Sequence, residues 1–384
     1  MRPGRKLAVS FPPVEAPLKH RWNLDQNYLT GITAGKWWRL LRENRFAVDP
    51  AYWHRGAFIT ILSFFNSVEA RREERLLAQR IEQTVVKDPP VFVLGHWRTG
   101  TTHLHNMLSR DPQFAYPNAY EVIHPWSFLT TEQARARNWA AQVRGKRPMD
   151  DMAVDAELPQ EDEIALALSC LRSPDLVMSF PRHRQRYERY LTFQGVPAAE
   201  VEEFKRTLRW YVKKLTLKHA RPLVLKSPPH TARIGLLLEL FPEARFVNIH
   251  REPYTVFLSC RHTNDTLHWY TYLQKPDLEQ VDDAILRTGR LVFDAFFAQR
   301  HLIPAGRLVD VAYEELEARP VEVVEGIYQA LGLPGFAEFR PRLQTYLDSL
   351  AGYRKNRFEK LDPSLTETVA RAWRPAFEEW GYPA

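Results

Sequence analysis

Four short apolar runs divide the chain and predict its central sheet. They read VFVLG at 91–95, PLVLKS at 222–227, RFVNIH at 245–250 and RLVDVAY at 307–313. Runs of this length that are rich in branched residues, without regular polar alternation, are typical of strands buried on both faces. Strands of this kind belong to parallel sheets covered by helices, so we expect four parallel strands.

Helical periodicity follows the first, second and last of these runs. Apolar residues recur there at intervals of three and four, which places them on one face of a helix. The alternation of strand and helix predicts an α/β fold with a central parallel sheet and crossover helices. The apolar positions are Leu104, Met107 and Leu108, then Ile234, Leu237, Leu238 and Phe241, and finally Val321, Val324, Ile327, Tyr328 and Leu331.

The chain between the first two runs is too long for a single crossover. We expect a helical insertion at about 110–221 within an α/β domain of residues 89–384, preceded by a helical N-terminal region at 1–88 packed on the core. Ligands of open α/β sheets bind beyond the carboxyl ends of the strands, so such an insertion could cover the site and select the substrate. The clearest helix of the insertion carries Val201, Phe204, Leu208, Tyr211, Val212 and Leu215 on one face.

Composition indicates an ordinary soluble globular protein. Of the 384 residues, 45% are hydrophobic and 26% are charged. A formal charge of +7 and a pI near 9.3 favour an anionic ligand, an acidic substrate or a membrane surface. The basic residues are scattered among acids, which does not indicate a nucleic-acid partner.

Cysteine usage and the longest apolar stretch address compartment and membrane. Cys170 and Cys260 are the only cysteines, and no Cys/His cluster exists, so we expect a reducing cytoplasm and no metal site. The stretch AFITILSFF at 57–65 is far shorter than the ~20 residues that span a bilayer. It is typical of a buried helix, and an interfacial helix in peripheral membrane contact fits the same pattern.

The motif GHWRTGTT at 95–102 follows the first predicted strand directly. Its spacing is that of the phosphate loop G-x-x-x-x-G-K-[ST], but Thr101 stands where the lysine would be. The amides of Gly100, Thr101 and Thr102 and the helix dipole can still hold one phosphate, whereas the grip on a β/γ pair is lost. The expected ligand is therefore not simply ATP. A glycine-rich turn with a threonine helix cap is the plain structural alternative.

A second motif, RFVNIHREPYTVFLSC, ends the third predicted strand. Pro253 suits the first turn of a helix, and Ser259 lies about two helical turns beyond Arg251. An arginine and a hydroxyl placed in this way can meet on one phosphate. Taken alone, the segment fits a salt-bridged strand-end arginine equally well.

Together the two motifs resemble those of the PAPS-dependent sulfotransferases, above all the bacterial ones. The donor of that family, 3′-phosphoadenosine 5′-phosphosulfate (PAPS), carries a phosphosulfate at the 5′ position and a second phosphate at 3′. The family's 5′ loop, K/R-[ST]-G-T-T, matches Arg98-Thr99-Gly100-Thr101-Thr102, and its 3′-phosphate site is an arginine followed eight positions later by a serine, as Arg251 and Ser259 are. The resemblance covers about 90–360 and implies a P-loop-type three-layer fold and no metal.

The resemblance also implies roles for individual cations. Arg98 occupies the position of the loop cation that stabilises the bridging oxygen, and Lys226 in VLKSPPHT that of a second cation against the sulfonate. Arg354 and Lys355 in GYRKNRF fall in a late basic loop that closes over the donor. The family's glycine after that pair is replaced by Asn356, and a solvated basic turn is the alternative.

The general base is left open between two residues. Glu121 falls where one branch of the family has a glutamate, and His230 lies near the histidine of another branch, offset by two positions. Glu121 could instead pair with a core arginine and His230 could cap a helix, or the two could act as one unit. Glu161 and Glu163 rank below them, because acids before an apolar helical pattern usually serve the helix N-terminus.

The expected function is transfer of a sulfonate from PAPS to a hydroxyl of a small-molecule, lipid or polyketide-like acceptor. The aromatic stretch FAYPNAYEVIHPWSFL favours an apolar acceptor pocket. A P-loop kinase or NTPase would require a lysine at 101 and a strand-end aspartate for magnesium, whereas Asp310 lies within a predicted strand. The other rival is a non-catalytic protein that binds anions or a membrane surface. The oligomeric state is left open.

Overall fold

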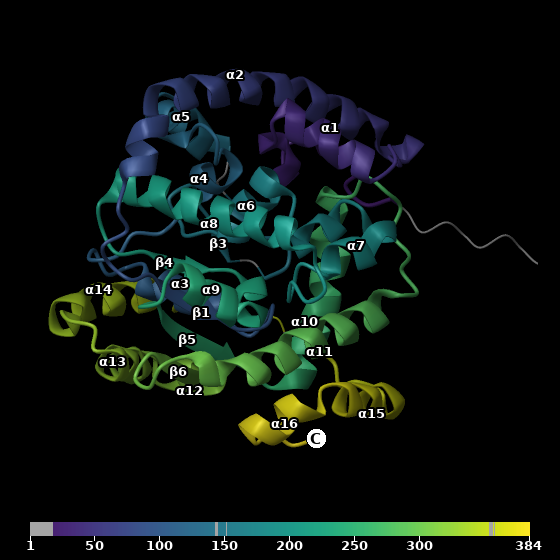
Figure 1. Cartoon of the computed structure of the whole chain (residues 1–384). Helices are drawn as coiled ribbons and strands as arrows, with labels where there is room; N and C mark the ends of the chain where they lie inside the picture. Colours follow the sequence, from purple (N-terminus) through teal and green to yellow (C-terminus); the bar gives the residue numbers. More distant parts are fainter. Residues whose placement is uncertain (1–17, 143–144, 151, 353–355, 357) are drawn as a thin grey trace, which may run out of the picture.

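A four-stranded parallel sheet lies at the centre of the computed structural model, which describes residues 18–142, 145–150, 152–352, 356 and 358–384 (Figure 1). The strand order is β4-β1-β5-β6, and every pairing in this sheet is parallel. The prediction of four parallel strands is confirmed. Their bounds are β1 Val91–Leu94, β4 Val224–Lys226, β5 Arg245–His250 and β6 Leu308–Ala312.

The strand order brings distant parts of the sequence to one edge of the sheet. β1 lies between β4 and β5, with Val93 paired to Lys226 and Leu94 to Asn248. The segments that leave β1, β4 and β5 therefore emerge side by side at the carboxyl edge, where ligands of open parallel sheets bind. These segments lead into α3 (Thr101–Leu108), η5 (Pro228–Ala232) and α10 (Pro253–Thr266).

Helices cover both faces of the sheet (Figure 1). In the part of the chain that is described before β1, the helices are η1 Tyr28–Gly31, α1 Ala34–Glu43, η2 Pro50–Tyr52 and α2 Trp53–Gln83. The segment between α3 and β4 contains α4 Ala119–Ile123, α5 Phe128–Gln142, β2 Gly145–Lys146, β3 Ala153–Val154, α6 Asp162–Cys170, η3 Pro174–Met178, η4 Pro181–His183, α7 Arg184–Glu188 and α8 Ala198–His219.

The remaining helices flank β5 and β6. Those placed before β6 are α9 Ile234–Leu240, η6 His268–Tyr270, α11 Val281–Gln299 and η7 Arg300–Leu302. Those after β6 are α12 Tyr313–Ala318, α13 Pro320–Leu331, α14 Phe336–Ser349, α15 Pro363–Ala372 and α16 Arg374–Trp380.

The largest apolar core joins the N-terminal helices to the sheet. Leu29 and Trp37 are fully buried in the same cluster as Phe92 and Leu94 of β1. In α2, residues 57–65 bury only one side: Ile59 is 1% exposed. The opposite side is open to solvent, so the expectation of a buried helix holds for only half of its surface. No helix in the described part of the chain has the length and apolar character needed to cross a bilayer.

A buried ion pair connects α2 to α8. The Lys214 ammonium contacts Glu73 and the carbonyl of Pro125, and it lies over the rings of Phe128 and Trp210 at 4.3 and 4.6 Å. Burial lowers the pKa of Lys214 to about 8 and raises that of Glu73. Each charge is therefore tolerated in the interior because the other is present.

Removing one partner of this pair should destabilise the fold. We expect Glu73→Gln to lower the free energy of unfolding by ~3–5 kcal/mol, because it leaves the buried ammonium without its counter-charge. Glu82→Gln is the matched control on the same helix: Glu82 pairs with Lys213 but is 85% exposed, and its loss should be about 0–1 kcal/mol. Urea unfolding followed by circular dichroism measures both, and equal losses would contradict the assignment.

Candidate active site

A cavity of about 830 Å³ opens at the carboxyl edge of the sheet and contains both sequence motifs. The phosphate-loop motif contributes Arg98, Gly100, Thr101 and Thr102 to its lining, and the second motif contributes Arg251 and Ser259. Further basic groups in the wall are His103, Arg110 and Arg342. The two segments, far apart in sequence, thus meet around one space rich in cations.

The phosphate loop turns sharply between β1 and α3 because two glycines adopt conformations that other residues avoid. Gly95 has φ 143° and Gly100 has φ 102°. A Cβ at Gly95 would lie 2.5 Å from the Ile249 carbonyl oxygen, and one at Gly100 would lie 2.4 Å from the Tyr313 ring. Arg98 also has a positive φ, 71°, which is unfavourable for a residue with a side chain. The backbone of the loop is therefore strained at this arginine.

The N-terminus of α3 faces the cavity with unused donors. The first backbone N–H to bond within the helix is that of Leu104, which donates to the Gly100 carbonyl at 3.1 Å. Thr99 closes the preceding turn, with its hydroxyl donating to the His96 carbonyl at 2.8 Å. The amides of Thr101 and Thr102 therefore have no acceptor in the helix, and with the helix dipole they favour an anion.

Arg98 is held by one neighbour on the second motif and by one acid outside both motifs. Its Nε donates to the Ser259 hydroxyl at 2.9 Å and its Nη2 to Asp150 at 3.0 Å. The Asp150 carboxylate also contacts Arg147 at 3.1 Å and lines the cavity. A carboxylate thus occupies an anion position between two guanidinium groups.

Arg251 is oriented by an aromatic ring at the start of α12, directly after β6. Its guanidinium lies over Tyr313 at 4.2 Å, and Nη1 donates to the Arg98 carbonyl at 3.4 Å. The Tyr313 ring in turn covers Gly100. Arg251 and Ser259 both line the cavity, so they face the same space as the residues of the phosphate loop.

Lys226 ends β4 close to the phosphate loop. Its ammonium lies 2.6 Å from Glu161 and 3.4 Å from the Thr102 hydroxyl. Burial lowers the pKa of Lys226, although the Glu161 charge opposes this effect. Glu161, which ranked low as a catalytic group in the sequence analysis, therefore lies against Lys226 close to the phosphate loop.

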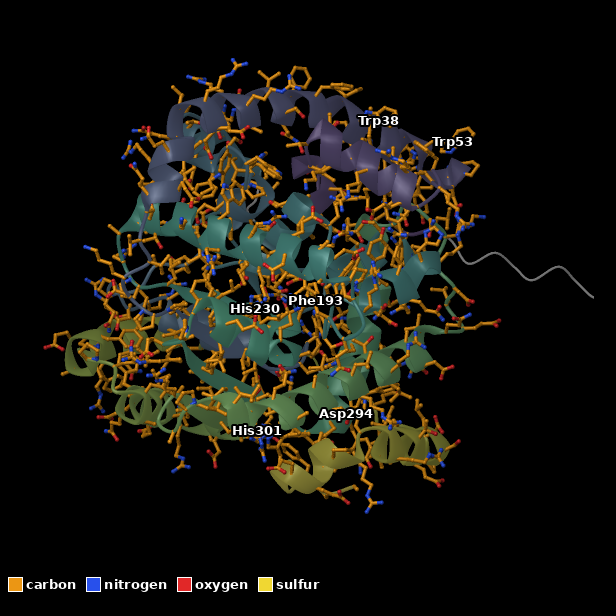
Figure 2. All side chains as sticks on the ribbon, viewed as in Figure 1. Trp38, Trp53, Phe193, His230, Asp294 and His301 are labelled. Atoms are coloured by element: carbon orange, nitrogen blue, oxygen red, sulfur yellow. The ribbon has the colours of Figure 1, made fainter. Side chains whose placement is uncertain are left out.

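His230 lies in the interior of the molecule (Figure 2). Its Nε2 is 2.6 Å from Asp162, and the Ser227 hydroxyl donates to the other oxygen of that carboxylate at 3.0 Å. Burial disfavours the charged Asp162, but the contacts with His230 and Ser227 outweigh it and lower the pKa of this carboxyl. His230 is fully buried and is not among the residues that line the cavity.

Glu121 caps α4 instead of facing the cavity. Its carboxylate accepts a hydrogen bond from the Asn118 backbone N–H at 2.7 Å. In turn, the side-chain oxygen of Asn118 accepts one from the Glu121 backbone N–H. The same carboxylate lies 2.7 Å from both Lys218 and His219. The structure thus brings Glu121 together with basic residues of α8, whereas the carboxylate partner of His230 is Asp162. The two candidate bases do not form one unit.

The late basic loop is described only in part. Arg354 and Lys355 lie outside the described residues. Their neighbour Asn356 donates from Nδ2 to the Met149 carbonyl at 2.8 Å, and both Asn356 and Phe358 line the cavity. Of this loop, Asn356 and Phe358 thus lie at the same space as the two motifs.

A second, smaller cavity of about 130 Å³ shares Arg98 with the first. Asp175 lines it, and no hydrogen bond to its carboxylate is found among the described residues. Burial, reinforced by the charges of Glu163 and Glu161, raises the pKa of Asp175 well above its ordinary range. Most other lining residues are apolar or uncharged, among them His96, Trp97, Pro174, Val177, Met178, Leu191, Cys260, Thr263, Ala284 and Ile285.

Three acidic residues of the site escaped the sequence analysis or ranked low in it. Glu161 belongs to an acidic run at the start of α6, which is also the usual place for helix-stabilising acids. Asp150 and Asp175 stand singly in segments without a motif, so no sequence signal distinguished them. Asp310 lies within β6 and accepts from Asn248 at 2.7 Å, away from the cavity lining.

Comparisons with known proteins agree on one family. Residues 89–338 match the sulfotransferase family. An omega-hydroxy-beta-dihydromenaquinone-9 sulfotransferase of Mycobacterium bovis is 36% identical over 357 residues, or 92% of this chain and 90% of that protein, and the Mycobacterium tuberculosis protein of the same name gives the same values. Crystal structures of sulfotransferases from Mycobacterium tuberculosis and Mycobacterium avium share the fold at 21% identity, with TM-scores of 0.61 and 0.57. They cover 84% and 91% of this chain, and 85% and 95% of their own.

The close approach of Tyr313 to Gly100 gives a direct test of the loop. We expect Gly100→Ala to destabilise the protein by about 2 kcal/mol or more, from strain at positive φ and the clash with the ring. Gly326→Ala, at an exposed helical position where a Cβ meets nothing within 4 Å, should instead stabilise by ~0.5–1 kcal/mol. Thermal unfolding distinguishes the two, and adding Tyr313→Ala should recover part of the loss. A neutral Gly100→Ala would refute the tight turn.

Proposed function

The chain belongs to the sulfotransferase family and is a sulfotransferase, and we propose that it transfers the sulfonate of PAPS to the hydroxyl of a lipid-like acceptor. The single observation that supports this best is the meeting of the two phosphate motifs in one cavity. The P-loop-type α/β fold with its central parallel sheet is the one that the family's structures have. Two free, buried cysteines fit a reducing cytoplasm as the site of action.

The proposed donor carries two separated anionic groups, and the cavity offers a separate set of contacts for each. We assign the 5′-phosphosulfate to the amides of Thr101 and Thr102, with Arg98 beside them. We assign the 3′-phosphate to Arg251 and Ser259. Arginine forms paired hydrogen bonds to phosphate oxygens, and a helix N-terminus supplies backbone donors. Asp150, held by two arginines at this place, marks an anion position that the donor would take over.

The residues around Lys226 supply what sulfonyl transfer requires. A bond forms between the acceptor oxygen and sulfur while the bond from sulfur to the bridging phosphate oxygen breaks. The leaving phosphate gains negative charge, which Arg98 and Lys226 stabilise from fixed positions. The acceptor hydroxyl must lose its proton to a base within hydrogen-bond reach.

We assign the base role to Glu161. Its carboxylate is 26% exposed and lies against Lys226, which in turn contacts the Thr102 hydroxyl of the phosphate loop. Glu121 and His230 are both fully buried and are held by partners of their own. We therefore propose that Glu121 stabilises the α4–α8 contact, and that the Asp162–His230 pair positions the end of β4.

The second cavity is the proposed acceptor site. Its mainly apolar wall suits a hydrocarbon or isoprenoid chain, and Arg98 connects it to the donor cavity. The relative from Mycobacterium bovis carries the name of a menaquinone sulfotransferase, which supports an apolar acceptor that ends in a hydroxyl. Asp175, with its raised pKa, would hydrogen-bond a polar group of the acceptor.

Loss of the 3′-phosphate contact tests the donor. Arg251→Ala should weaken binding of 3′,5′-adenosine bisphosphate by on the order of 2–4 kcal/mol, the range for truncating one partner of a desolvated charge pair. Binding of 5′-AMP should hardly change, because it lacks the group that Arg251 contacts. Arg290→Ala, an exposed arginine of α11, is the control. Calorimetry that finds equal affinity for both nucleotides in the native chain would refute the donor assignment.

Variants of the three candidate bases, with one control, test the proton acceptor. Glu161→Gln should lower kcat by roughly 10²- to 10⁴-fold while leaving affinity for the bisphosphate intact. Glu157→Gln, an exposed acid on the same segment, should leave kcat unchanged. Glu121→Gln should reduce stability more than turnover, since its carboxylate is an interior ion-pair partner. Near-normal turnover of Glu161→Gln together with an inactive His230→Asn that still folds would transfer the role to His230.

A further inference from the structure

One face of α2 is apolar although it is turned to solvent. Trp53, Ile61, Phe64, Phe65 and Val68 are 64%, 57%, 55%, 66% and 63% exposed. Their spacing places them on one side of the helix, along roughly 22 Å at 1.5 Å per residue. These five residues are called the apolar face below. An exposed stripe of this size on a soluble protein marks a contact surface.

Charge is almost absent along the apolar face. Between Trp53 and Val68 the sequence contains no Asp, Glu or Lys, and its one arginine, Arg55, is 1% exposed. The inner side of the same helix is packed on the protein through Ile59 and Ser63. The helix therefore presents apolar groups on both sides, and only the inner side is covered within the described chain.

Aromatic residues extend this surface at the N-terminal end of α2. Trp22 is 68% exposed and lies 4.6 Å from the ring of His54, next to Trp53. Trp38 of α1 is 47% exposed and packs on Phe46 at 6.3 Å. Figure 2 shows Trp38 and Trp53 at the outer rim of the molecule, on α1 and the start of α2. Tryptophan is the residue most typical of the boundary between water and hydrocarbon.

Arginines continue the stripe toward the C-terminal end of α2. Arg71, Arg72 and Arg75 are exposed and fall on the same side of the helix as the apolar face. Arg42 and Arg45 are exposed at the end of α1. A row of apolar side chains followed by cations complements a bilayer with anionic headgroups, where the aromatic groups enter the interface and the arginines meet phosphate.

The inner side of α2, at its N-terminal end, lies near the proposed acceptor site. Arg55 of α2 donates to the carbonyls of Trp269 and Tyr272 at 2.9 and 3.0 Å. That segment, around η6, directly follows α10, and both Asn264 and His268 line the second cavity. The segment formed by the end of α10 and η6 therefore lies between the N-terminal end of α2 and the cavity assigned to the acceptor.

We propose that the protein docks on anionic membranes through the apolar face, with the adjacent tryptophans in the interface and the arginines of α1 and α2 on the headgroups. An acceptor dissolved in the bilayer would then reach the second cavity without crossing water. The last step rests on the proposed function, whereas docking itself depends only on this surface. The occupant is a lipid surface, because the face is a long convex helix side flanked by cations and not a groove shaped for a peptide.

Vesicle co-sedimentation of the full chain tests the docking. We expect binding to vesicles of phosphatidylcholine with phosphatidylglycerol, and at least a roughly tenfold weaker partition for Ile61→Ser/Phe65→Ser, since two side chains no longer enter the interface. Leu291→Ser/Leu302→Ser is the matched control, because these leucines are 37% and 47% exposed on α11 and η7. The control should bind like the native chain, and unchanged thermal unfolding of both variants shows that the fold is kept.

The charge contribution is tested separately. Arg71→Gln/Arg72→Gln/Arg75→Gln should weaken binding to the anionic vesicles and make it less sensitive to salt, because screening acts on the lost contacts. Binding to vesicles of phosphatidylcholine alone should be weak in both chains. Equal binding of the native chain to both vesicle types would overturn the electrostatic half of the proposal.

Three results would overturn docking as a whole. These are absence of vesicle binding by the native chain, full binding by Ile61→Ser/Phe65→Ser, and a native dimer that this variant converts to a monomer without any affinity for vesicles. The measurement uses no donor or acceptor, so its outcome is independent of the sulfonate transfer. If docking serves catalysis, the variant should lose rate on a hydroxylated lipid in vesicles and keep it on a short-chain soluble alcohol.

Discussion

The parallel order of β4, β1 and β5 is the constraint on which the rest of the site depends. Three strands that run side by side in one direction must end at the same edge, so the chain leaves them within reach of a single ligand. The glycines of the phosphate loop make the turn after β1 tight enough for α3 to begin at this edge. Arg98, Lys226 and Arg251 then stand at or just after the ends of three different strands: Arg98 and Arg251 line one cavity, and Lys226 contacts Thr102, which lines it too. Each of them is held by a neighbour from another segment.

Buried ion pairs behind this edge hold the segment that follows β4 in place. The Arg233–Glu163 pair is fully buried with contacts of 2.6 and 3.0 Å, and Glu163 follows Asp162 at the start of α6. Asp162 holds His230 on the segment after β4, and Glu161 contacts Lys226 at the end of that strand. Three successive acids at the start of α6 thus bind three basic residues at and just after the end of β4. Such pairs are sensitive to loss of either partner, which favours one defined position of α6 against the sheet.

The helices outside the core α/β unit connect the chemistry to its surroundings. The segment between α3 and β4 supplies Asp150, Asp175 and the acidic start of α6, so it contributes to both cavities. The N-terminal helices share the apolar core with β1 and expose the apolar face on their other side. Arg55, on the buried side of α2, connects this helix to the segment around η6, which contributes to the wall of the apolar cavity. The apolar cavity and the apolar face both suit an acceptor that is poorly soluble in water.

The sequence by itself determined the four strands, the phosphate loop and the second motif, because periodicity, glycine conformation and helix starts depend on residues close together in the chain. It also indicated the family, since both motifs are local. Only the tertiary structure decided which acid meets which base. Glu121 and Glu161 both stand at helix starts, yet one is held by Lys218 and His219 of α8 and the other contacts Lys226. In the same way, the pattern at 57–65 is apolar on all sides, and which side stays open depends on where the rest of the molecule packs. Contacts between distant segments are set by the packing of the whole core, and no short stretch of sequence contains that information.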